Sequence, residues 1–260
     1  MVTGSETGRW GSALSLGAAL CGLETTVYTG QDVSDQERFR MQTWGASVVG
    51  SRVASLDDAL ADVAGDPQSR FAAGSVFNHV VLHQTLIGLE ARQQLALAGE
   101  ERPDVVIGCC GSGSCLGGTA LPFAGDEGVR LVAVEPSSWP TLTAGRFGYV
   151  PGDAAGLLPL LPMYSLGPDS VPPAELLPGV RSHGVAPVIC ELVRSGRMEA
   201  VAQPLNGVRE AATQWARTEG PVPSLATAHA VRAVVDEAVL AREAGTETVI
   251  LFSWSGHARG

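Results

Sequence analysis

A glycine-rich turn at residues 108–118, GCCGSGSCLGG, is the segment best suited to chemistry. It follows a predicted buried strand, Asp104 to Ile107, and leads into a predicted helix of small residues. Backbone N–H groups in such a turn can point at one anion, and a helix N-terminus adds to the attraction. We therefore predict a phosphate-binding loop over Gly111, Ser112, Gly113 and Ser114. A tight structural turn is the alternative that the residues leave open.

Three more specific motifs are excluded because a residue that each requires is missing from this turn. A dinucleotide-binding fingerprint needs a third glycine at position 116, which is Leu116. A Walker loop needs a Gly-Lys-Ser/Thr sequence, and the chain contains no lysine. A nucleophile elbow around Ser114 needs glycines at positions that Ser112 and Leu116 occupy.

Two further segments place polar groups beside predicted turns. Glu6 precedes a Gly-rich turn and a helix, which suits an acid/base group next to an anion-binding helix end, although a cap with a turn is the commoner use. Ser253-Trp254-Ser255-Gly256-His257 follows a predicted strand. Because α/β enzymes bind ligands at strand ends, a hydroxyl there could hold a heteroaromatic ring nitrogen.

The histidines give weaker signals. His79 and His83 have the i, i+4 spacing of a metal pair on a predicted helix, but no acidic third ligand is near. Two packed histidines on one helix face are the favoured interpretation, and we expect no metal site. His183 lies in a long connection, where it could reach a site or cap the next helix.

The composition limits the partners. The 260 residues carry a net charge of −10, all 17 basic residues are arginine, and no basic cluster suits nucleic acid or an anionic membrane surface. No apolar stretch is long enough to cross a bilayer, and the N-terminus lacks the features of a signal peptide. The five cysteines are irregularly spaced, which favours reduced thiols. We therefore expect a cytoplasmic protein.

Helical and strand patterns alternate along the chain, which predicts an α/β fold. The predicted strands are 25–29, 46–49, 104–107, 129–134, 200–202 and 248–252. The predicted helices are 12–23, 36–44 (capped by Ser34 or Asp35 and ended by Gly45), 55–63, 77–97, 206–218 and 226–244. Residues 136–188 are rich in Pro and Gly, so we expect a long connection that has little regular structure and carries a site.

Several motifs together resemble one family. Glu6-Thr7-Gly8…Trp10-Gly11-Ser12-Ala13-Leu14 and residues 74–88, GSVFNHVVLHQTLIG, look like two signatures of the second type of tryptophan synthase β-subunit. Shorter matches are Ala133-Val134-Glu135-Pro136, Gly152-Asp153, Arg181-Ser182-His183-Gly184, Arg217-Thr218-Glu219-Gly220 and Ser255-Gly256-His257. The resemblance covers the whole chain. It implies fold type II of the pyridoxal-phosphate (PLP) enzymes, with parallel sheets flanked by helices.

The resemblance also implies roles for single residues. The Gly111 to Cys115 turn corresponds to the loop that binds the PLP phosphate. Ser255 corresponds to the serine that hydrogen-bonds the ring nitrogen, leaving it unprotonated and favouring β-elimination and β-replacement. Glu6 corresponds to the catalytic glutamate that manages protons. The implied substrate-binding residues are Thr7, Gly8, Gly11 and Asp169.

The family resemblance further implies two domains and a partner. Residues 1–80 would be the remainder of an incomplete, mobile N-terminal domain on the substrate side, and residues 81–260 the large PLP-phosphate-binding domain. The family segment that carries the Schiff-base lysine has no counterpart in these 260 residues. A second protein chain would therefore supply that lysine, in a heterodimer or heterotetramer.

Three alternative functions agree with these observations, and the first is the leading hypothesis. The first is a lysine-free subunit of a split PLP enzyme that catalyses β-replacement or β-elimination on a serine-like amino acid. The second is a non-catalytic scaffold or regulatory partner of a PLP enzyme. Three differences from the resembled family favour it. Arg9 stands in a shortened form of the loop that binds the substrate carboxylate in that family, Ala226 replaces a glutamate near the cofactor and Cys115 replaces an asparagine of the phosphate loop. The third is a lysine-independent enzyme that holds another phosphorylated ligand.

Overall fold

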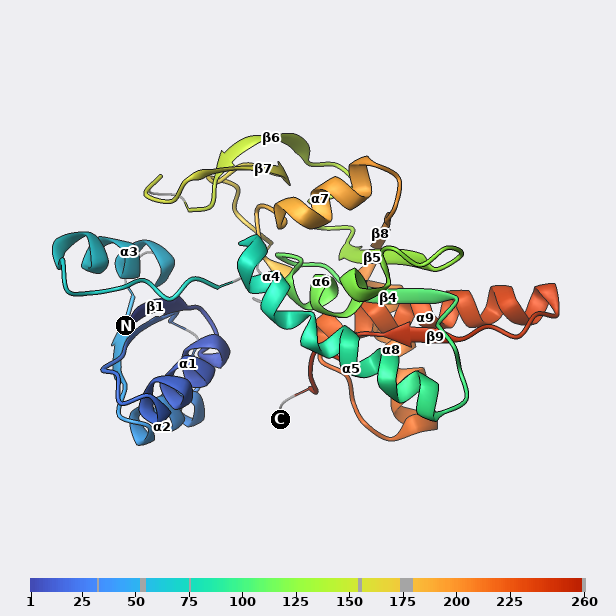
Figure 1. Ribbon diagram of the computed structural model, residues 1–260, viewed down its shortest axis with the longest axis horizontal. Coiled ribbons are helices and arrows are strands. Elements are labelled where there is room, and N and C mark those ends of the chain that lie inside the picture. Colours follow the sequence, from blue (N-terminus) through green and yellow to red (C-terminus); the bar gives the residue numbers. More distant parts are fainter. Residues whose placement is uncertain (32, 52–54, 75, 154–155, 174–179, 259–260) are drawn as a thin grey trace. The chain divides into compact units, whose positions relative to one another are not determined.

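The chain forms two compact units in a computed structural model that describes residues 1–31, 33–51, 55–74, 76–153, 156–173 and 180–258 (Figure 1). One unit is Met1–Gly74 with Pro151–Leu160, and the other is Ser75–Val150 with Leu161–Gly260. The first part of the chain thus ends near the expected division at residue 80, and a later segment joins it. The roles expected for the two parts stay predictions. No helix in the described ranges has the length and apolar character to cross a membrane.

The first unit contains a three-stranded parallel sheet in the order β1-β2-β3, with Val2 opposite Thr26 and Thr26 opposite Ser47. Its strands are β1 (Val2–Ser5), β2 (Thr26–Thr29) and β3 (Ser47–Gly50). Its helices are α1 (Arg9–Leu20), α2 (Asp35–Thr43) and α3 (Ser55–Gly65). Val27, Val33, Met41 and Ala46 form the small core between the sheet and α2. The sequence did not predict β1, because its residues Val-Thr-Gly-Ser include a glycine and a serine, whereas β2 is the β-branched and aromatic run Thr-Val-Tyr-Thr.

Local sequence sets the ends of α2. The side chain of Ser34 accepts a hydrogen bond from the N–H of Glu37 at 3.2 Å, so Ser34, of the two expected candidates, is the N-cap. Gly45 has a φ of 84° and ends the helix, as predicted. The expected strand–helix–strand unit in the first third of the chain is therefore confirmed.

The second unit is built on a four-stranded parallel sheet in the order β8-β5-β4-β9. These strands are β4 (Val105–Cys109), β5 (Arg130–Pro136), β8 (Glu199–Gln203) and β9 (Ile250–Phe252). The helices of the unit are α4 (Asn78–Gln84), α5 (Leu86–Leu97), α6 (Ser114–Ala120), α7 (Pro187–Arg194), α8 (Leu205–Glu219) and α9 (Leu225–Ala244), with a 3₁₀ turn at Leu121–Phe123. This arrangement confirms the predicted α/β fold with parallel sheets and helices.

Both faces of the four-stranded sheet are buried. Val106, Leu131 and Ala133 pack into the core on the side of α6 and α7. Their neighbours Ile107 and Val132 pack on the opposite side against α9. Since side chains alternate between the faces of a strand, continuous apolar runs are what a doubly covered parallel sheet requires.

Two sequence-based expectations about the second unit were wrong. The helix predicted over residues 77–97 is divided at Thr85, where the hydroxyl donates to the carbonyl of Leu82 at 2.6 Å and the turn tightens. The connection 136–188 contains regular structure: β6 (Arg146–Pro151) pairs with β7 (Leu160–Ser165), and α7 begins at Pro187. Strand pairing and helix packing, which are contacts distant in sequence, stabilise these elements despite their Pro and Gly content. Residues 174–179 of this connection lie outside the described residues.

Candidate functional site

The glycine loop and the C-terminal segment leave the same edge of the second sheet. Strands β4 and β9 are parallel neighbours, with Ile107 opposite Phe252. The chain therefore emerges from their carboxyl ends side by side, into residues 110–115 after β4 and 253–257 after β9. Open parallel sheets bind ligands at this edge.

The conformation of the glycine loop depends on Gly113. This residue has a φ of 93° and precedes the first residue of α6. A Cβ atom here would lie 3.0 Å from Cγ1 of Ile189 and 3.1 Å from Cγ1 of Val185. The carbonyl of Ser112 also accepts a hydrogen bond of 2.8 Å from the N–H of Ala186. The loop is thus seated on the start of α7.

The loop leaves a row of hydrogen-bond donors open. Within the part of the chain that the structure describes, the backbone N–H groups of Ser112, Gly113, Ser114 and Cys115 donate to no other residue. Ser114 and Cys115 belong to the first turn of α6, whose N–H groups have no partner inside the helix. Such a set of donors matches the oxygens of a phosphate group. The loop therefore fits the phosphate of PLP.

Side chains connect the loop to the C-terminal segment. The sulfur of Cys115 lies 3.2 Å from the hydroxyl oxygen of Ser253, which lies 3.2 Å from the hydroxyl oxygen of Thr119. Ser253 is itself buried. The predicted loop residues and the segment around Ser255 are therefore held together in one place.

The start of α9 holds Ser255. Its hydroxyl oxygen lies 3.0 Å from that of Thr227, a fully buried residue in the first turn of the helix. The N–H of Ser224 donates to the carbonyl of Gly256 at 2.9 Å, which fixes the backbone beside Ser255. Ser255 is exposed, so its hydroxyl is open to a ligand. No motif in the sequence pointed to Thr227, although Ser224, at an N-cap position before a long apolar helix, was a signal for this turn.

The surroundings of Ala226 are apolar. Ala226 and Cys109 pack against Trp139 and Val180. Burial raises the pKa of the Cys109 thiol, with smaller contributions from Cys115 and Glu135, so Cys109 is a neutral thiol at pH 7. Ala226, in the first turn of α9, thus lies in apolar surroundings.

Glu135, in the matched Ala133 to Pro136 segment, is a buried carboxylate with a structural use. Its oxygens accept hydrogen bonds from the N–H groups of Leu142 (2.7 Å) and Thr143 (2.8 Å) and from the Thr143 hydroxyl. Burial raises the pKa of this carboxyl, while these hydrogen bonds act in the opposite direction. Glu135 thus fixes the turn that follows β5.

Glu6, in the first unit, is exposed and caps a helix. Its Oε1 atom accepts hydrogen bonds from the N–H of Ser55 at 3.0 Å and from the Ser55 hydroxyl at 2.5 Å. Ser55 is the first residue of α3, so the carboxylate satisfies an open N–H group at that helix end. Glu6 thus caps a helix distant in sequence, whereas the N-cap of the helix that follows it is Gly8. The acid/base role of Glu6 stays a prediction.

The expected substrate-binding residues of the first unit also have structural contacts. Gly8 adopts a φ of 78° as the N-cap of α1. The N–H of Gly11 donates to the Ser5 hydroxyl oxygen at 3.0 Å, and a Cβ atom on Gly11 would lie 2.5 Å from Cγ1 of Val27. Thr7, which precedes Gly8 in the turn, is partly buried. A role in substrate binding remains a prediction for all three.

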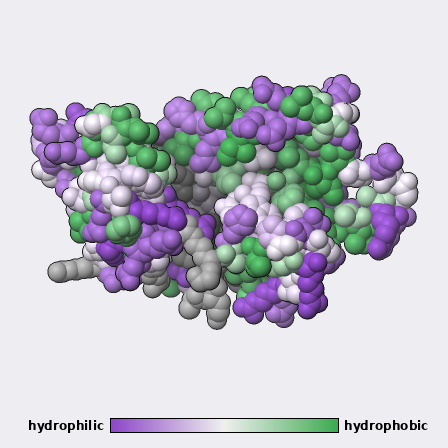
Figure 2. Space-filling view, turned by 90° about the horizontal axis from the view of Figure 1, so that it is seen from below, coloured by the Kyte–Doolittle hydropathy of each residue, from purple (hydrophilic) through white to green (hydrophobic). Residues whose placement is uncertain are grey.

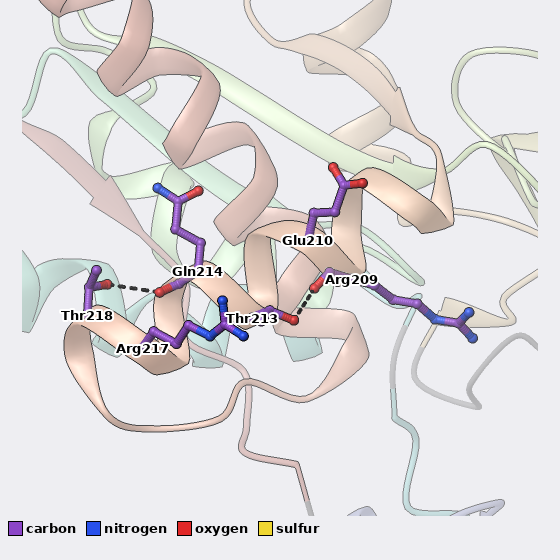
Figure 3. A pocket seen from close by; sticks show the side chains of 6 residues that line it. All are labelled: Arg209, Glu210, Thr213, Gln214, Arg217 and Thr218. Atoms are coloured by element: carbon purple, nitrogen blue, oxygen red, sulfur yellow. Dashed lines mark hydrogen bonds between the residues drawn. The ribbon is translucent and has the colours of Figure 1, made fainter.

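Asp169 belongs to the second unit, in an exposed turn after β7. The adjacent residues 165–168 line a surface hollow of about 390 Å³ together with residues 144–148 and Val150. A larger hollow of about 580 Å³ is lined by residues of α8, and the Arg209 side chain extends away from this helix (Figure 3). The residues that line these two hollows do not include any of the glycine loop.

The histidines on α4 differ from the expectation in one respect. His79 and His83 are both exposed on α4, so the expectation of two packed histidines was wrong, although His79 lies 5.6 Å from the Phe77 ring. Among the described residues no group of three His, Cys, Asp or Glu side chains is arranged to hold a metal ion. The Nδ1 atom of His183 lies 3.2 Å from the Ser165 hydroxyl oxygen.

Comparison with known families gives a direct result. Residues 1–256 match the family model described as pyridoxal-phosphate dependent enzyme. The chain belongs to this family. PLP is accordingly the cofactor of the proteins to which it is related, and the open N–H groups of the glycine loop fit its phosphate.

Two proteins named tryptophan synthase beta chain 2 are similar to almost the whole of this chain. The chain is 43% identical over 286 residues to "Tryptophan synthase beta chain 2" of Methanosarcina acetivorans, covering 99% of this chain and 64% of that protein. It is 42% identical to the protein of the same name from Thermotoga maritima, covering 99% of this chain and 67% of the relative. The chain thus spans about two thirds of the length of these relatives. The resemblance to tryptophan synthase β-subunits is therefore confirmed.

A solved structure confirms the fold class. A crystal structure of threonine deaminase matches with a TM-score of 0.72 at 18% identity, covering 100% of this chain and 77% of the other. At this identity the match concerns the fold alone. It supports the predicted fold type II architecture.

Proposed function

We propose that this chain is one subunit of a split PLP enzyme, and that a second protein chain supplies the Schiff-base lysine. The reaction is β-replacement or β-elimination on a serine-like amino acid. The observation that carries the proposal is the edge of the second sheet, where open N–H groups and the Ser255 hydroxyl lie together. Family membership and identity to tryptophan synthase β chains support the reaction type.

The cofactor and each of these residues have a defined task in this proposal. Bound PLP supplies an electron sink that stabilises negative charge at the substrate Cα. The N–H groups of residues 112–115 bind and orient the phosphate, and Ser255 contacts the ring nitrogen. Glu6 holds or delivers a proton at one of its carboxylate oxygens.

Exposed apolar side chains support the proposal of a partner chain. Large apolar side chains reach the solvent on α1 and α5, including Leu20 (81% exposed), Leu86 (68%) and Leu97 (88%). Figure 2 shows hydrophobic residues at the surface among hydrophilic ones on the face it presents. Such side chains are what a protein that packs against a second chain exposes before assembly.

A specific observation favours the scaffold alternative: the Glu6 carboxylate is engaged at the N-terminus of α3. One substitution separates the two functions. Glu6→Gln keeps an oxygen that can accept from Ser55 but removes the acid/base group, so a catalytic Glu6 predicts loss of turnover with normal assembly. If Glu6→Gln supports full activity of the assembled complex, this chain contributes shape rather than proton transfer.

Activity assays test the reaction class. The chain is assembled with a chain that carries the family's lysine segment and supplied with serine and PLP. Release of pyruvate and ammonia measures β-elimination, and consumption of an added nucleophile such as indole measures β-replacement. We expect one of these activities only in the assembled complex. Absence of both with every serine-like substrate, in a complex that contains PLP, would contradict the proposed reaction.

A further inference from the structure

The strand before the glycine loop and the helix after it lie in contact. Strand β4 precedes the loop and α6 follows it. A Cβ atom on Gly108, in β4, would lie 2.8 Å from Cδ1 of Leu116, in α6. The distance between this strand and this helix determines how the loop between them is shaped. A contact that fixes both of them therefore also fixes the N–H groups of residues 112–115.

Ser253, at the end of β9, makes such a contact. Its N–H donates to the carbonyl of Ile107, in β4, at 2.9 Å. Its hydroxyl oxygen lies 3.2 Å from the sulfur of Cys115 and 3.2 Å from the hydroxyl oxygen of Thr119, both in α6. Ser253 and Thr119 are 7% and 3% exposed, so water competes little for these contacts. We call the contacts of Ser253 with Ile107, Cys115 and Thr119 the Ser253 clamp.

The hydrogens of the clamp have one assignment that satisfies every contact. The Thr119 hydroxyl donates to the carbonyl of Cys115 at 3.2 Å, and a hydroxyl has a single hydrogen. The hydrogen between Thr119 and Ser253 therefore comes from Ser253. The hydrogen between Ser253 and Cys115 then comes from the thiol. The Ser253 hydroxyl thus both donates and accepts within α6, and its removal breaks two contacts at once.

Two other anchors of the loop are bonds between backbone groups. The N–H of Cys110 donates to the carbonyl of Val134 at 2.7 Å, and the carbonyl of Ser112 accepts from the N–H of Ala186 at 2.8 Å. These bonds fix the first part of the loop, and they do not depend on which side chains the residues carry. The clamp fixes the end of the loop through side chains. The residue type at position 253 therefore controls the shape of that end.

We propose that Ser253 is a positioning residue of the glycine loop, which joins β4 to α6 and so holds the loop's N–H groups ready for a phosphate group. A loop that is ordered before the ligand arrives does not have to be ordered on binding, which favours affinity. The inference rests on the proposed function, because it takes the loop to bind the cofactor phosphate. Ser253 acts through Cys115 and Thr119 rather than by touching the phosphate.

The test measures phosphate binding without chemistry. The probes are inorganic phosphate and 4′-deoxypyridoxine 5′-phosphate, a ring compound that has the cofactor's phosphate but no aldehyde and so needs no lysine. The dissociation constants of both probes and the ³¹P chemical shift of the bound ring compound are measured with the full chain and with the assembled complex. The variants are Ser253→Ala, Cys115→Ala and the double variant. Ser195→Ala is the matched control, because Ser195 is exposed and its hydroxyl donates to the Leu192 carbonyl, away from the clamp.

We expect Ser253→Ala to weaken the binding of both probes by the same factor, about tenfold, because the loop loses a hydrogen-bonded anchor. The ³¹P shift of the bound ring compound changes as well. Cys115→Ala weakens both probes equally but less, and the double variant binds no more weakly than Ser253→Ala, since the clamp is already broken. Ser195→Ala leaves both dissociation constants and the shift unchanged. Cys115 is partly exposed, so Cys115→Ala tests the clamp even if Ser253→Ala does not fold.

Three results overturn the inference. Unchanged binding of both probes to folded Ser253→Ala assigns Ser253 to structure alone. A loss for the ring compound without a loss for inorganic phosphate shows that Ser253 acts on the ring and not on the loop. Additive losses in the double variant show that Ser253 and Cys115 act independently.

The proposed function fails in a different way. If the wild-type chain and complex bind inorganic phosphate with the expected response to Ser253→Ala but do not bind the ring compound, the clamp stands and the PLP enzyme proposal fails. If the wild-type protein binds neither probe, both fail.

Discussion

Gly113 determines whether the loop can present its N–H groups. A side chain there meets two obstacles, the left-handed φ of 93° and the nearby carbons of Ile189 and Val185. The left-handed conformation alone costs about 1 to 2 kcal/mol for a residue with a Cβ atom. The loop's shape and its donors therefore depend on the same residue.

Gly113→Ala is expected to lower the free energy of unfolding by about 1 to 2 kcal/mol and to weaken PLP binding at least tenfold. Gly125→Ala is the control, since a Cβ atom on Gly125 meets nothing within 4 Å and its φ is not left-handed. Denaturant unfolding and PLP titration check both variants. Equal PLP affinity in the two variants would contradict the assignment of the loop to the phosphate.

Glu6 has a helix-capping contact that can be separated from any chemistry. Glu6→Ala removes the acceptor for Ser55 and is expected to destabilise the first unit by about 1 kcal/mol, the usual cost of a lost cap. Glu6→Gln is expected to lose much less stability because it keeps an oxygen. Thermal unfolding of the two variants measures the difference, and equal losses would show that the charge rather than the hydrogen bond stabilises α3.

At the scale of elements, α5 and α6 touch through backbone. A Cβ atom on Gly88 would lie 2.4 Å from the carbonyl oxygen of Thr119 and 2.9 Å from that of Gly118. Gly117 and Gly118 of α6 likewise lie against Val81 and Gln84 of α4. These glycines thus let α6, which follows the glycine loop, pack closely against α4 and α5, which precede strand β4.

Gly88→Ala is expected to destabilise the second unit by about 1 to 3 kcal/mol, the range of an overpacked core. Gly207→Ala in α8 is the matched control, because its Cβ atom would meet only ordinary contacts at 3.6 and 3.9 Å. Chemical denaturation with urea compares the two. The close approach would be disproved if Gly88→Ala were as stable as Gly207→Ala.

The elements also show how far the sequence could predict the fold. The central strands β4 and β5 were predicted because buried parallel strands are continuous apolar runs, and α2 because Ser34 and Gly45 mark its ends. Strands β6 and β7 were not predicted, since their pairing depends on residues distant in sequence. For the same reason the contact of Glu6 with Ser55, 49 residues away, could not be anticipated, and neither could the network around Thr227.

At the scale of the whole molecule, a buried histidine makes stability depend on pH. His229 in α9 is 1% exposed and donates from Nδ1 to the Leu225 carbonyl at 2.7 Å. Burial lowers the pKa of its imidazole from 6.5, although the hydrogen bond to Leu225 acts in the opposite direction. The unfolded chain therefore takes up a proton below about pH 6.5 that the folded chain does not, and stability falls as the pH falls.

His229→Gln is expected to reduce this pH dependence. Between pH 7 and pH 5 the wild-type chain should lose more unfolding free energy than the variant, with a slope of at most about 1.4 kcal/mol per pH unit for one histidine. His79→Gln, at an exposed position, is the control and should keep the wild-type slope. Denaturant curves across this pH range provide the measurement, and parallel curves for wild type and His229→Gln would refute the assignment.

The most direct measurement of the central claim locates the lysine that binds PLP. The chain is incubated with PLP alone and together with a chain that carries the family's lysine segment, reduced with borohydride and digested for mass spectrometry. We predict a phosphopyridoxyl group on a lysine of the second chain, present only in the assembled complex and lost when Gly113→Ala is used. A phosphopyridoxyl lysine formed without a second chain, on the polypeptide that contains these 260 residues, would contradict the split site. So would an assembled complex that binds no PLP.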